Sequence, residues 1–192
     1  MRLILVRHPA PHVALALCYG SSDVAVTPAA LHAALATLAT TLPPLSPTAT
    51  LPIYSSPLQR CATLAVALAA QRNAPPVQFD ARLAEMDFGR WELQPWERID
   101  RAEIDAWAAD LAHYAPGGGE TVLQVATRVA AFVDALKSQR TGDAIVVCHA
   151  GTMRLLSALQ QAPRGAPLAT VAAHAAATAH RIDYAATITL QF

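Results

Sequence analysis

Two histidines stand directly after runs of apolar residues, and they are the side chains of this 192-residue sequence best placed to do chemistry. His8, with Arg7 before it, follows the apolar run 3–6, and His149 follows the run 144–148. Such runs, without helical spacing, predict strands that are buried on both faces of a sheet. Taken alone, the first run could be an ordinary strand that ends in a surface Arg-His pair. Because two buried strands end in histidine, we expect both imidazoles at one edge of a single sheet, where open α/β folds bind ligands.

Arg60 and Glu85 are the next candidates for that edge. The pair Ser56-Pro57 is typical of a helix start, with Ser56 as the cap, and predicts a helix that runs to about Arg72 with Arg60 in its first turn. The amino end of a helix offers unpaired N–H groups and a positive dipole, which suit an anion. Glu85 lies in a loop among apolar neighbours. Taken singly, the two are more typical of a surface arginine and a solvated loop glutamate.

Together these side chains suit the transfer of a phosphoryl group to histidine. Arg7 and Arg60 can clamp a phosphate, and His8 between them can attack phosphorus. Neighbouring positive charges lower the pKa of an imidazole from its unperturbed value of about 6.5, so we expect His8 to be neutral near pH 7. Its other ring nitrogen then needs an acceptor, for which we predict a backbone carbonyl. His149 would help the arginines to neutralise phosphate charge.

A proton donor is also required, because an alkoxide is a poor leaving group. We assign this role to Glu85, which as a carboxylate could afterwards activate water against the phosphohistidine. Arginine and histidine would supply the charge that magnesium supplies in other phosphoryl-transfer enzymes, so we expect no metal and no other cofactor. A histidine metal site also lacks acceptable ligand spacing in this sequence.

Composition limits the classes of partner. Hydrophobic residues make up 54% of the chain and charged residues 15%, which argues against disorder, and the formal net charge of zero argues against nucleic acid or an anionic membrane. The apolar run before Arg7 is too short for a signal peptide, and no run approaches the length of a membrane span. Cys18, Cys61 and Cys148 lack CxxC spacing, which favours buried thiols in a reducing compartment. We expect a cytoplasmic protein whose partner is a small phosphorylated metabolite, with a homo-oligomer left open.

The remaining elements follow from caps, periodicity and turn residues. The loop 9–26 begins beside His8 and could lie over the site. The pair Thr27-Pro28 predicts the start of a helix that ends at about Leu42. A capping box of Thr121 and Gln124 predicts the start of another helix, which ends before Gly142. Further predictions are a helix over 97–113, short strands at 53–55, 77–79, 181–184 and 187–190, a surface connection up to Pro52, and an alanine-rich tail from Leu168 without a clear pattern.

Four segments resemble, in the same order, the signature blocks of the histidine phosphatase superfamily, also called phosphoglycerate-mutase-like. They are Leu3 to His8, Ser55 to Arg60, Leu83 to Glu92, and Val146 to Arg154. The resemblance implies an α/β fold, a three-layer αβα sandwich with a mostly parallel central sheet, in one domain over residues 1–192. It also implies a phosphohistidine on His8, a proton donor at Glu85, and a phosphate pocket formed by Arg7, His8, Arg60, His149 and Gly151. Pro9, Leu93 and Ala150 stand where the family commonly has glycine, but none of them replaces a reacting group.

One branch of the family, the α-ribazole phosphatases, is similar in further segments: Arg7-His8-Pro9, the Cys18-Tyr19-Gly20 loop with Asp23, the stretch from Trp96 to Trp107, and Gly118-Gly119-Glu120. This similarity implies a metal-independent phosphomonoesterase for α-ribazole 5′-phosphate or cobalamin 5′-phosphate in cobalamin biosynthesis. Tyr19, Gly20 and Ser21 are then the expected substrate-binding residues, and the tryptophans are either packing or ligand contacts. A broad phosphatase for small metabolites and a non-catalytic phosphate-binding module stay open as alternatives.

Overall fold

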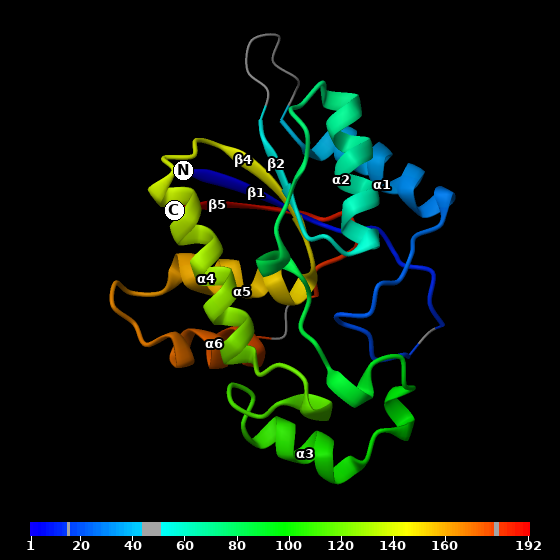
Figure 1. The fold of residues 1–192 in the computed structure, drawn as a ribbon, viewed down its shortest axis with the longest axis vertical. Helices are drawn as coiled ribbons and strands as arrows, with labels where there is room; N and C mark the ends of the chain where they lie inside the picture. Colours follow the sequence, from blue (N-terminus) through cyan, green and yellow to red (C-terminus); the bar gives the residue numbers. More distant parts are fainter. Residues whose placement is uncertain (15, 44–50, 179–180) are drawn as a thin grey trace.

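A five-stranded sheet in the order β3-β2-β4-β1-β5 forms the centre of the computed structural model, which describes residues 1–14, 16–43, 51–178 and 181–192 (Figure 1). Four strands are parallel: β1 (Arg2–Arg7), β2 (Ile53–Ser55), β3 (Gln78–Phe79) and β4 (Ala144–Cys148). The fifth, β5 (Thr187–Gln191), pairs with β1 in the antiparallel direction and closes one edge. The predicted strands at 53–55, 77–79 and 187–190 are confirmed, and the two ends of the chain lie side by side.

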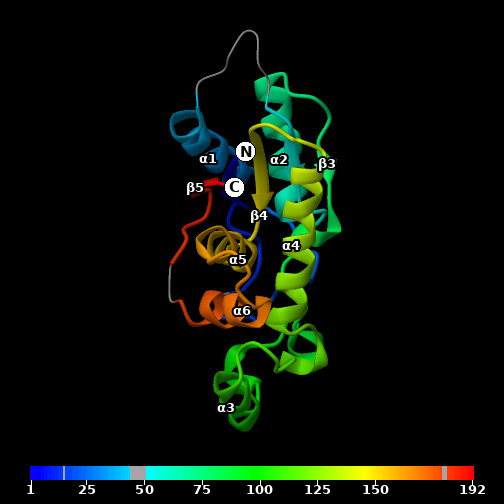
Figure 2. The same ribbon diagram turned by 90° about the vertical axis from the view of Figure 1, so that its left-hand side faces the viewer.

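Helices cover both faces of this sheet (Figures 1 and 2). Alternate residues of a strand face opposite sides, and in β1 Leu3 and Leu5 join one buried cluster while Ile4 and Val6 join the other. One face is covered by α1 (Pro28–Thr41) and α2 (Gln59–Arg72), and the other by α4 (Val122–Ser138), α5 (Ala150–Gln161) and α6 (Leu168–Ala177). The predicted three-layer αβα sandwich with a mostly parallel sheet is confirmed.

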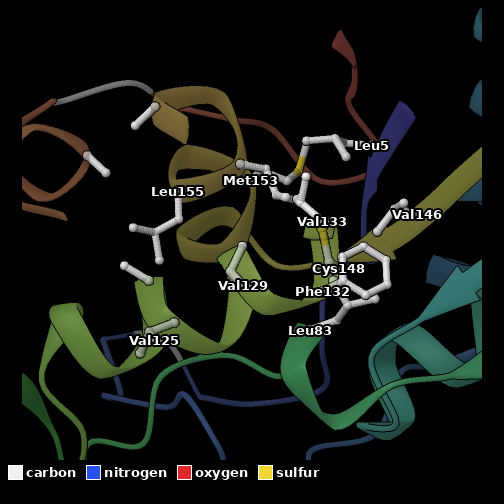
Figure 3. Packing of buried hydrophobic residues seen from close by; sticks show 14 of the residues in the cluster. Leu5, Leu83, Val125, Val129, Phe132, Val133, Val146, Cys148, Met153 and Leu155 are labelled. Atoms are coloured by element: carbon white, nitrogen blue, oxygen red, sulfur yellow. The ribbon is translucent and has the colours of Figure 1, made fainter. Parts of the chain in front are cut away.

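The larger cluster fixes the helix that follows β4. Val125, Val129, Phe132 and Val133 of α4 pack against the strands and against Met153 and Leu155 of α5, as Figure 3 shows. Burying side chains of this size stabilises the fold by about 1.5–3 kcal/mol each. Because α5 begins at Ala150, directly after β4, this packing also fixes the backbone around His149.

Two of the predicted helix starts have the expected caps, and a third does not. The Thr27 side chain accepts a hydrogen bond from the N–H of Ala30 at 3.1 Å, and the capping box of Thr121 and Gln124 is present with hydrogen bonds of 2.7 and 3.1 Å. The prediction that Ser56 caps α2 is wrong. Leu58 is the N-cap of α2 and has no side-chain cap, because the helix begins two residues later than predicted, at Gln59. The Ser56 hydroxyl instead contacts the N–H of Leu58 at 3.3 Å and Nε2 of His149 at 2.8 Å.

Three other predictions need correction. The helix over 97–113 is shorter, since Asp100 caps α3 (Arg101–Ala109) through a 2.9 Å hydrogen bond from the N–H of Ala102. The tail from Leu168 contains α6, which its uniform alanine content concealed. Residues 181–184 do not form a strand, because the chain turns there and Ala185 has a positive φ of 58° before β5 begins. Most of the predicted connection before Pro52 lies outside the described residues.

Figures 1 and 2 both place α3 far from the sheet, beyond the carboxyl ends of β1 and β4. The chain leads to α3 through the 3₁₀ turn Gly89–Trp91 and continues from it through the 3₁₀ turn Pro116–Gly118. A small aromatic cluster around Trp91, Cys18 and Ile99 holds this part of the chain together. Within the described ranges, none of the helices has the length and apolar character needed to cross a membrane.

Candidate active site

The pairing of β1 with β4 brings the two predicted histidines together. Arg7 is the register partner of Cys148, and the N–H of His8 donates to the carbonyl of Cys148 at 3.1 Å. The imidazole rings that follow have centroids 5.1 Å apart. Both side chains are buried, with exposed fractions of 2% for His8 and 0% for His149. The sequence prediction that two strand ends deliver both histidines to one edge of the sheet agrees with this geometry.

The surroundings of His8 hold it as a neutral imidazole with one defined tautomer. Its Nδ1 lies 2.7 Å from the carbonyl oxygen of Pro9, which can only accept, so Nδ1 carries the proton. The lone pair is therefore at Nε2. Burial lowers the pKa of His8 to about 3, with the charges of Arg60 and Arg7 acting in the same direction and the Pro9 carbonyl opposing them. Sequence reasoning gave the direction of this shift, but not burial as its largest cause.

Arg60 connects the second histidine to the loop that follows β1. The first turn of α2 places its side chain in the interior with no exposed surface. Its Nε donates to Nδ1 of His149 at 3.2 Å, Nη1 donates to the carbonyl of Ser22 at 2.8 Å, and Nη2 donates to the carbonyl of Gly20. The guanidinium thus fixes the His149 ring and the loop together at the edge of the sheet.

His149 is also neutral. Since Nδ1 accepts from Arg60, Nε2 carries the proton and donates to the Ser56 hydroxyl at 2.8 Å. Burial lowers the pKa of His149 well below its usual value, and the nearby Arg60 and His8 lower it further. The ring therefore offers an N–H donor to the site, and it would carry a positive charge only once an anion stands close by.

Arg7 is held by a segment that the sequence did not mark as part of the site. Its Nη1 donates to the carbonyl of Ile182, and its guanidinium carbon lies 4.0 Å from the centre of the Tyr184 ring. The Tyr184 ring is also 5.6 Å from the His8 ring, and its hydroxyl is 3.0 Å from that of Tyr19. Tyr184 therefore lies beside both Arg7 and His8, although no sequence motif surrounds it.

Glu85 reaches the same edge from the loop after β3. Its Oε2 accepts from the N–H of Gly151 at 3.1 Å, and its Oε1 accepts from the N–H of Met86 at 3.1 Å. Gly151, which the sequence placed among the phosphate-binding residues, thus gives its N–H to the Glu85 carboxylate. A Cβ at Gly151 would lie only 2.4 Å from Oε1 of Glu85. The absence of a side chain there is what allows the carboxylate to sit against the start of α5.

Replacing Gly151 with alanine should therefore displace the Glu85 carboxylate and lower kcat/KM for a phosphomonoester by about tenfold to hundredfold, because displacements near 1 Å cost this much. Thermal stability should hold or rise, since alanine favours helices over glycine by roughly 1 kcal/mol. Gly142→Ala is the matched control, because a Cβ there meets nothing within 4 Å. Unchanged turnover in the Gly151→Ala protein would contradict this role.

A single carboxylate fixes the conformation of the loop after β1. Glu92 accepts from the backbone N–H groups of Gly20, Ser21 and Ser22 at 3.0, 2.9 and 3.2 Å. Burial alone would raise the pKa of Glu92, but the hydrogen bonds from the Ser22 hydroxyl and the backbone N–H groups hold it below its usual value. Gly20 and Ser21, which the sequence marked as substrate-binding, are thus bound by Glu92, and this anchoring role was not predicted.

A cavity of about 480 Å³ opens beside Arg7 and Glu85. Arg7, Tyr19, Glu85, Gly151 and Arg154 contribute to its polar wall. The remaining wall is apolar and includes Leu17, Met86, Phe88, Trp96, Trp107, Leu111, Val122, Val125 and Leu155. Trp96 and Trp107 are stacked, with ring centroids 6.4 Å apart and an interplanar angle of 6°. Trp107, for which packing was one of the two predicted roles, both packs against Trp91 and lines the cavity.

Metal ligands do not converge in the described ranges, where the His, Cys, Asp and Glu side chains form no group of three or more able to hold an ion. The expectation of a metal-independent reaction stays a prediction for the chelator experiment below. The cysteines are buried thiols, as the sequence predicted.

Comparison with known proteins identifies the family. Residues 3–187 match the histidine phosphatase superfamily, branch 1. The chain belongs to the histidine phosphatase superfamily. Two curated members match it over part of their length. A glucosyl-3-phosphoglycerate phosphatase of Mycolicibacterium vanbaalenii is 36% identical over 126 residues, which are 60% of this chain and 54% of that protein. An adenosylcobalamin/alpha-ribazole phosphatase of Escherichia coli is 32% identical over 110 residues, or 55% and 54% of the two chains.

Solved structures of this superfamily share the whole fold. The alpha-ribazole phosphatase of Shigella flexneri superposes with a TM-score of 0.77 at 27% identity, over 98% of this chain and 89% of that one. A mycobacterial glucosyl-3-phosphoglycerate phosphatase gives a TM-score of 0.76 at 25% identity, over 99% and 89%. The sequence matches span about half the length of the curated relatives. Neither likeness by itself separates the two substrates.

Proposed function

We propose that this histidine phosphatase superfamily member is a phosphomonoesterase that works without a metal and through a phosphohistidine on His8. The observation that supports this most directly is the state of His8. It is neutral, its Nδ1 proton is bound by the Pro9 carbonyl, the charges of Arg60 and Arg7 act on its ring, and the His149 ring is 5.1 Å away. An unprotonated nucleophile among fixed positive charges is what attack on a phosphate dianion requires.

In the first step, Nε2 of His8 forms a bond to phosphorus while the bond from phosphorus to the ester oxygen breaks. The electron pair of that bond leaves with the oxygen, and protonated Glu85 gives its proton to it, so that an alcohol departs. Arg7 and Arg60 stabilise the charge on the other phosphate oxygens, and the N–H of His149 donates to them once the phosphate replaces the Ser56 hydroxyl as its partner.

In the second step, water takes the place of the alcohol. The Glu85 carboxylate accepts a proton from water as its oxygen bonds to phosphorus, and the bond between Nε2 and phosphorus breaks. Inorganic phosphate leaves, His8 is neutral again, and Glu85 is again an acid. The two Glu85 roles need its carboxyl group at one fixed place, which the N–H groups of Gly151 and Met86 provide.

For the substrate we propose α-ribazole 5′-phosphate or the related cobalamin 5′-phosphate of cobalamin biosynthesis, in the cytoplasm. The cavity supports this choice, because its aromatic wall of Phe88, Trp96 and Trp107 lies next to the reacting residues and offers flat surface to a benzimidazole ring. The similarity to the adenosylcobalamin/alpha-ribazole phosphatase of Escherichia coli and to the alpha-ribazole phosphatase of Shigella flexneri also supports it.

Glucosyl-3-phosphoglycerate is the second candidate, and one observation favours it. Arg154 of α5 also lines the cavity, and a guanidinium there suits a substrate that carries a carboxylate in addition to its phosphate. The Mycolicibacterium vanbaalenii relative bears the corresponding name. A broad phosphatase for small metabolites is the remaining alternative.

A panel of phosphate esters tests these proposals. Purified protein is assayed with α-ribazole 5′-phosphate, glucosyl-3-phosphoglycerate, ribose 5-phosphate and nitrophenyl phosphate, each with and without a chelator. We expect turnover that resists the chelator and a preference for α-ribazole 5′-phosphate. A preference for the glycerate ester would favour the second candidate, and equal rates with ribose 5-phosphate would favour the broad phosphatase. If the protein hydrolyses none of these esters, the result would favour a non-catalytic phosphate-binding module.

Tyr19 gives a sharper test of the aromatic substrate. It lines the cavity, and aromatic contact adds about 0.5–1.5 kcal/mol beyond area burial. Tyr19→Ala should therefore lower kcat/KM for α-ribazole 5′-phosphate by about threefold to tenfold and change nitrophenyl phosphate much less. Tyr19→Phe is the matched control, because it keeps the ring but loses the 3.0 Å hydroxyl contact with Tyr184. If the phenylalanine and alanine variants lose the same factor, the Tyr184 contact matters and the ring does not.

A further inference from the structure

The loop that carries Glu85 is held from behind by one arginine of α4. Arg128 donates through Nη1 to the carbonyls of Arg82 at 2.8 Å and Ala84 at 2.7 Å, and through Nη2 to the carbonyl of Glu85 at 3.2 Å. Three carbonyls of one short segment thus converge on a single guanidinium. This segment begins in the 3₁₀ turn Ala81–Leu83, and from there to the turn at Gly89 no helix or strand is present to fix the backbone.

A carboxylate holds the guanidinium in place. Glu120 accepts from Nε of Arg128 through Oε1 and from Nη2 through Oε2, both at 2.9 Å, which is a bidentate pair. Both side chains are largely buried, with exposed fractions of 19% for Arg128 and 28% for Glu120. Oε2 of Glu120 also accepts from the N–H of Asp87 at 3.1 Å, and the N–H of Glu120 donates to the Asp87 carbonyl at 2.8 Å. The pair therefore binds the segment on both sides of Glu85.

The helix that carries Arg128 is anchored in the core. Its neighbours on α4, Val125, Val129 and Phe132, lie in the main buried cluster against the sheet and α5 (Figure 3). Through its hydrogen bond to the Glu85 carbonyl, Arg128 thus attaches the backbone of Glu85 to the same core that positions β1 and β4. The carboxyl group of Glu85 meets the N–H of Gly151 on α5. The Thr152 hydroxyl of α5 also donates to the carbonyls of Leu83 and Ala84, at 3.3 and 3.4 Å.

We infer that Arg128, oriented by Glu120, is a positioning residue that sets the distance between the proton donor Glu85 and the leaving oxygen of the substrate. This inference rests on the proposed phosphatase function and on Glu85 as its acid. It assigns to the ion pair a role in proton transfer, in addition to the stability that a partly buried pair lends to a loop.

Leaving groups separate these two roles. In Arg128→Gln, hydrolysis of an alkyl phosphate such as ribose 5-phosphate should fall by about tenfold to hundredfold, since displacement near 1 Å costs that much. Nitrophenyl phosphate, whose leaving group needs no proton, should lose less than about threefold. Arg128→Lys should lie between, because an ammonium cannot reproduce a fork that serves a carboxylate and several carbonyls. Added to Glu85→Gln, Arg128→Gln should cause no further loss on the alkyl ester.

Two further proteins keep the test decisive. Arg128→Gln alone leaves the Glu120 carboxylate partly buried without its cation, so the paired Arg128→Gln/Glu120→Gln protein is measured as well and should show the same leaving-group dependence. Arg72→Lys is the matched control, because Arg72 also donates to a backbone carbonyl, that of Pro43 at 2.8 Å, on the opposite face of the sheet. It should lose no activity on either ester.

The outcomes distinguish this inference from the proposed function. If the native protein hydrolyses none of the four esters of the panel, the phosphatase proposal fails. If the native protein hydrolyses ribose 5-phosphate and nitrophenyl phosphate, and the Arg128 variants are folded by circular dichroism but lose the same factor on both esters, the positioning role is overturned while the function stands. A further loss of the alkyl activity when Arg128→Gln is added to Glu85→Gln would also overturn it.

Discussion

Replacing His8 with alanine should abolish phosphomonoester hydrolysis and leave the protein folded. Removal of a covalent nucleophile typically costs about 10⁴-fold or more in kcat, since no neighbouring group can form the same intermediate. The fold should persist because His8 follows the last residue of β1, outside the two apolar clusters, and its backbone N–H still donates to the Cys148 carbonyl. The measurement is kcat for nitrophenyl phosphate beside the circular dichroism spectrum and the Tm.

The native protein supplies the complementary observation. Brief mixing with a phosphate ester labelled on phosphorus should trap the label on His8, as an adduct that is labile in acid and stable in base. Label on a serine or an aspartate, or undiminished activity of His8→Ala, would defeat the phosphohistidine mechanism. Retained binding of inorganic phosphate by an inactive His8→Ala protein would agree with it, because Arg7, Arg60 and His149 remain.

The same variant has a second readout in its response to acid. The pKa of His8 is about 3 in the folded protein and close to 6.5 when unfolded, so between these values the unfolded chain binds the additional proton. Stability should therefore fall as the pH drops from 6.5 toward 3. His8→Ala removes its share of this loss, whereas His149, whose pKa is also lowered, keeps its own. Urea unfolding at pH 7 and pH 4.5 should show the smaller decrease in the variant.

The sequence predicted the parts of the site that follow from strands. Runs 3–6 and 144–148 predicted buried strands, and parallel pairing then puts His8 and His149 side by side, as the 5.1 Å between their rings shows. The pKa direction of His8 followed from the arginines near it. Glu85 was found by its apolar neighbours and by its place in a signature segment, and the structure brings it to Gly151 at the start of α5.

The parts that were missed depend on contacts between distant segments. Tyr184 comes to Arg7 because β5 pairs antiparallel with β1, and although the sequence predicted a strand at 187–190, it did not predict this pairing. Ser56 resembles a helix cap in sequence, but α2 begins at Gln59, and the Ser56 hydroxyl contacts the His149 ring. Arg128 looks like any polar position of an amphipathic helix, and only the folded loop shows which carbonyls it binds. Side-chain hydrogen bonds of this kind are set by tertiary structure, which periodicity does not contain.

Glu85→Gln should slow the hydrolysis of poor leaving groups far more than that of nitrophenyl phosphate. Glutamine keeps one oxygen that can accept from the N–H of Gly151 and loses the one that accepts from Met86, while the carbonyls of this segment stay bound to Arg128, so the loop should stay in place. Glutamine has no carboxyl proton to give and cannot act as a base toward water. General acid help is typically worth about 10²–10⁴-fold, and it matters least where the leaving group is already a stable anion. The measurement is the ratio of the two losses in kcat/KM, with ribose 5-phosphate as the alkyl ester and the Tm as a control for folding.

Equal losses on both esters would move the acid role away from Glu85, and the structure limits where it could go. Glu92 and Asp87 are the other carboxylates of this segment. The hydrogen bonds that Glu92 accepts from the loop hold its pKa below the usual value despite burial, so it stays ionised and is a poor proton donor. Asp87 accepts from the Ser21 hydroxyl at 3.1 Å and from the N–H of Gly89 at 2.8 Å, and would have to leave both to reach a substrate. A leaving-group dependence that survives in Glu85→Gln would therefore point to water or to the substrate itself as the source of the proton.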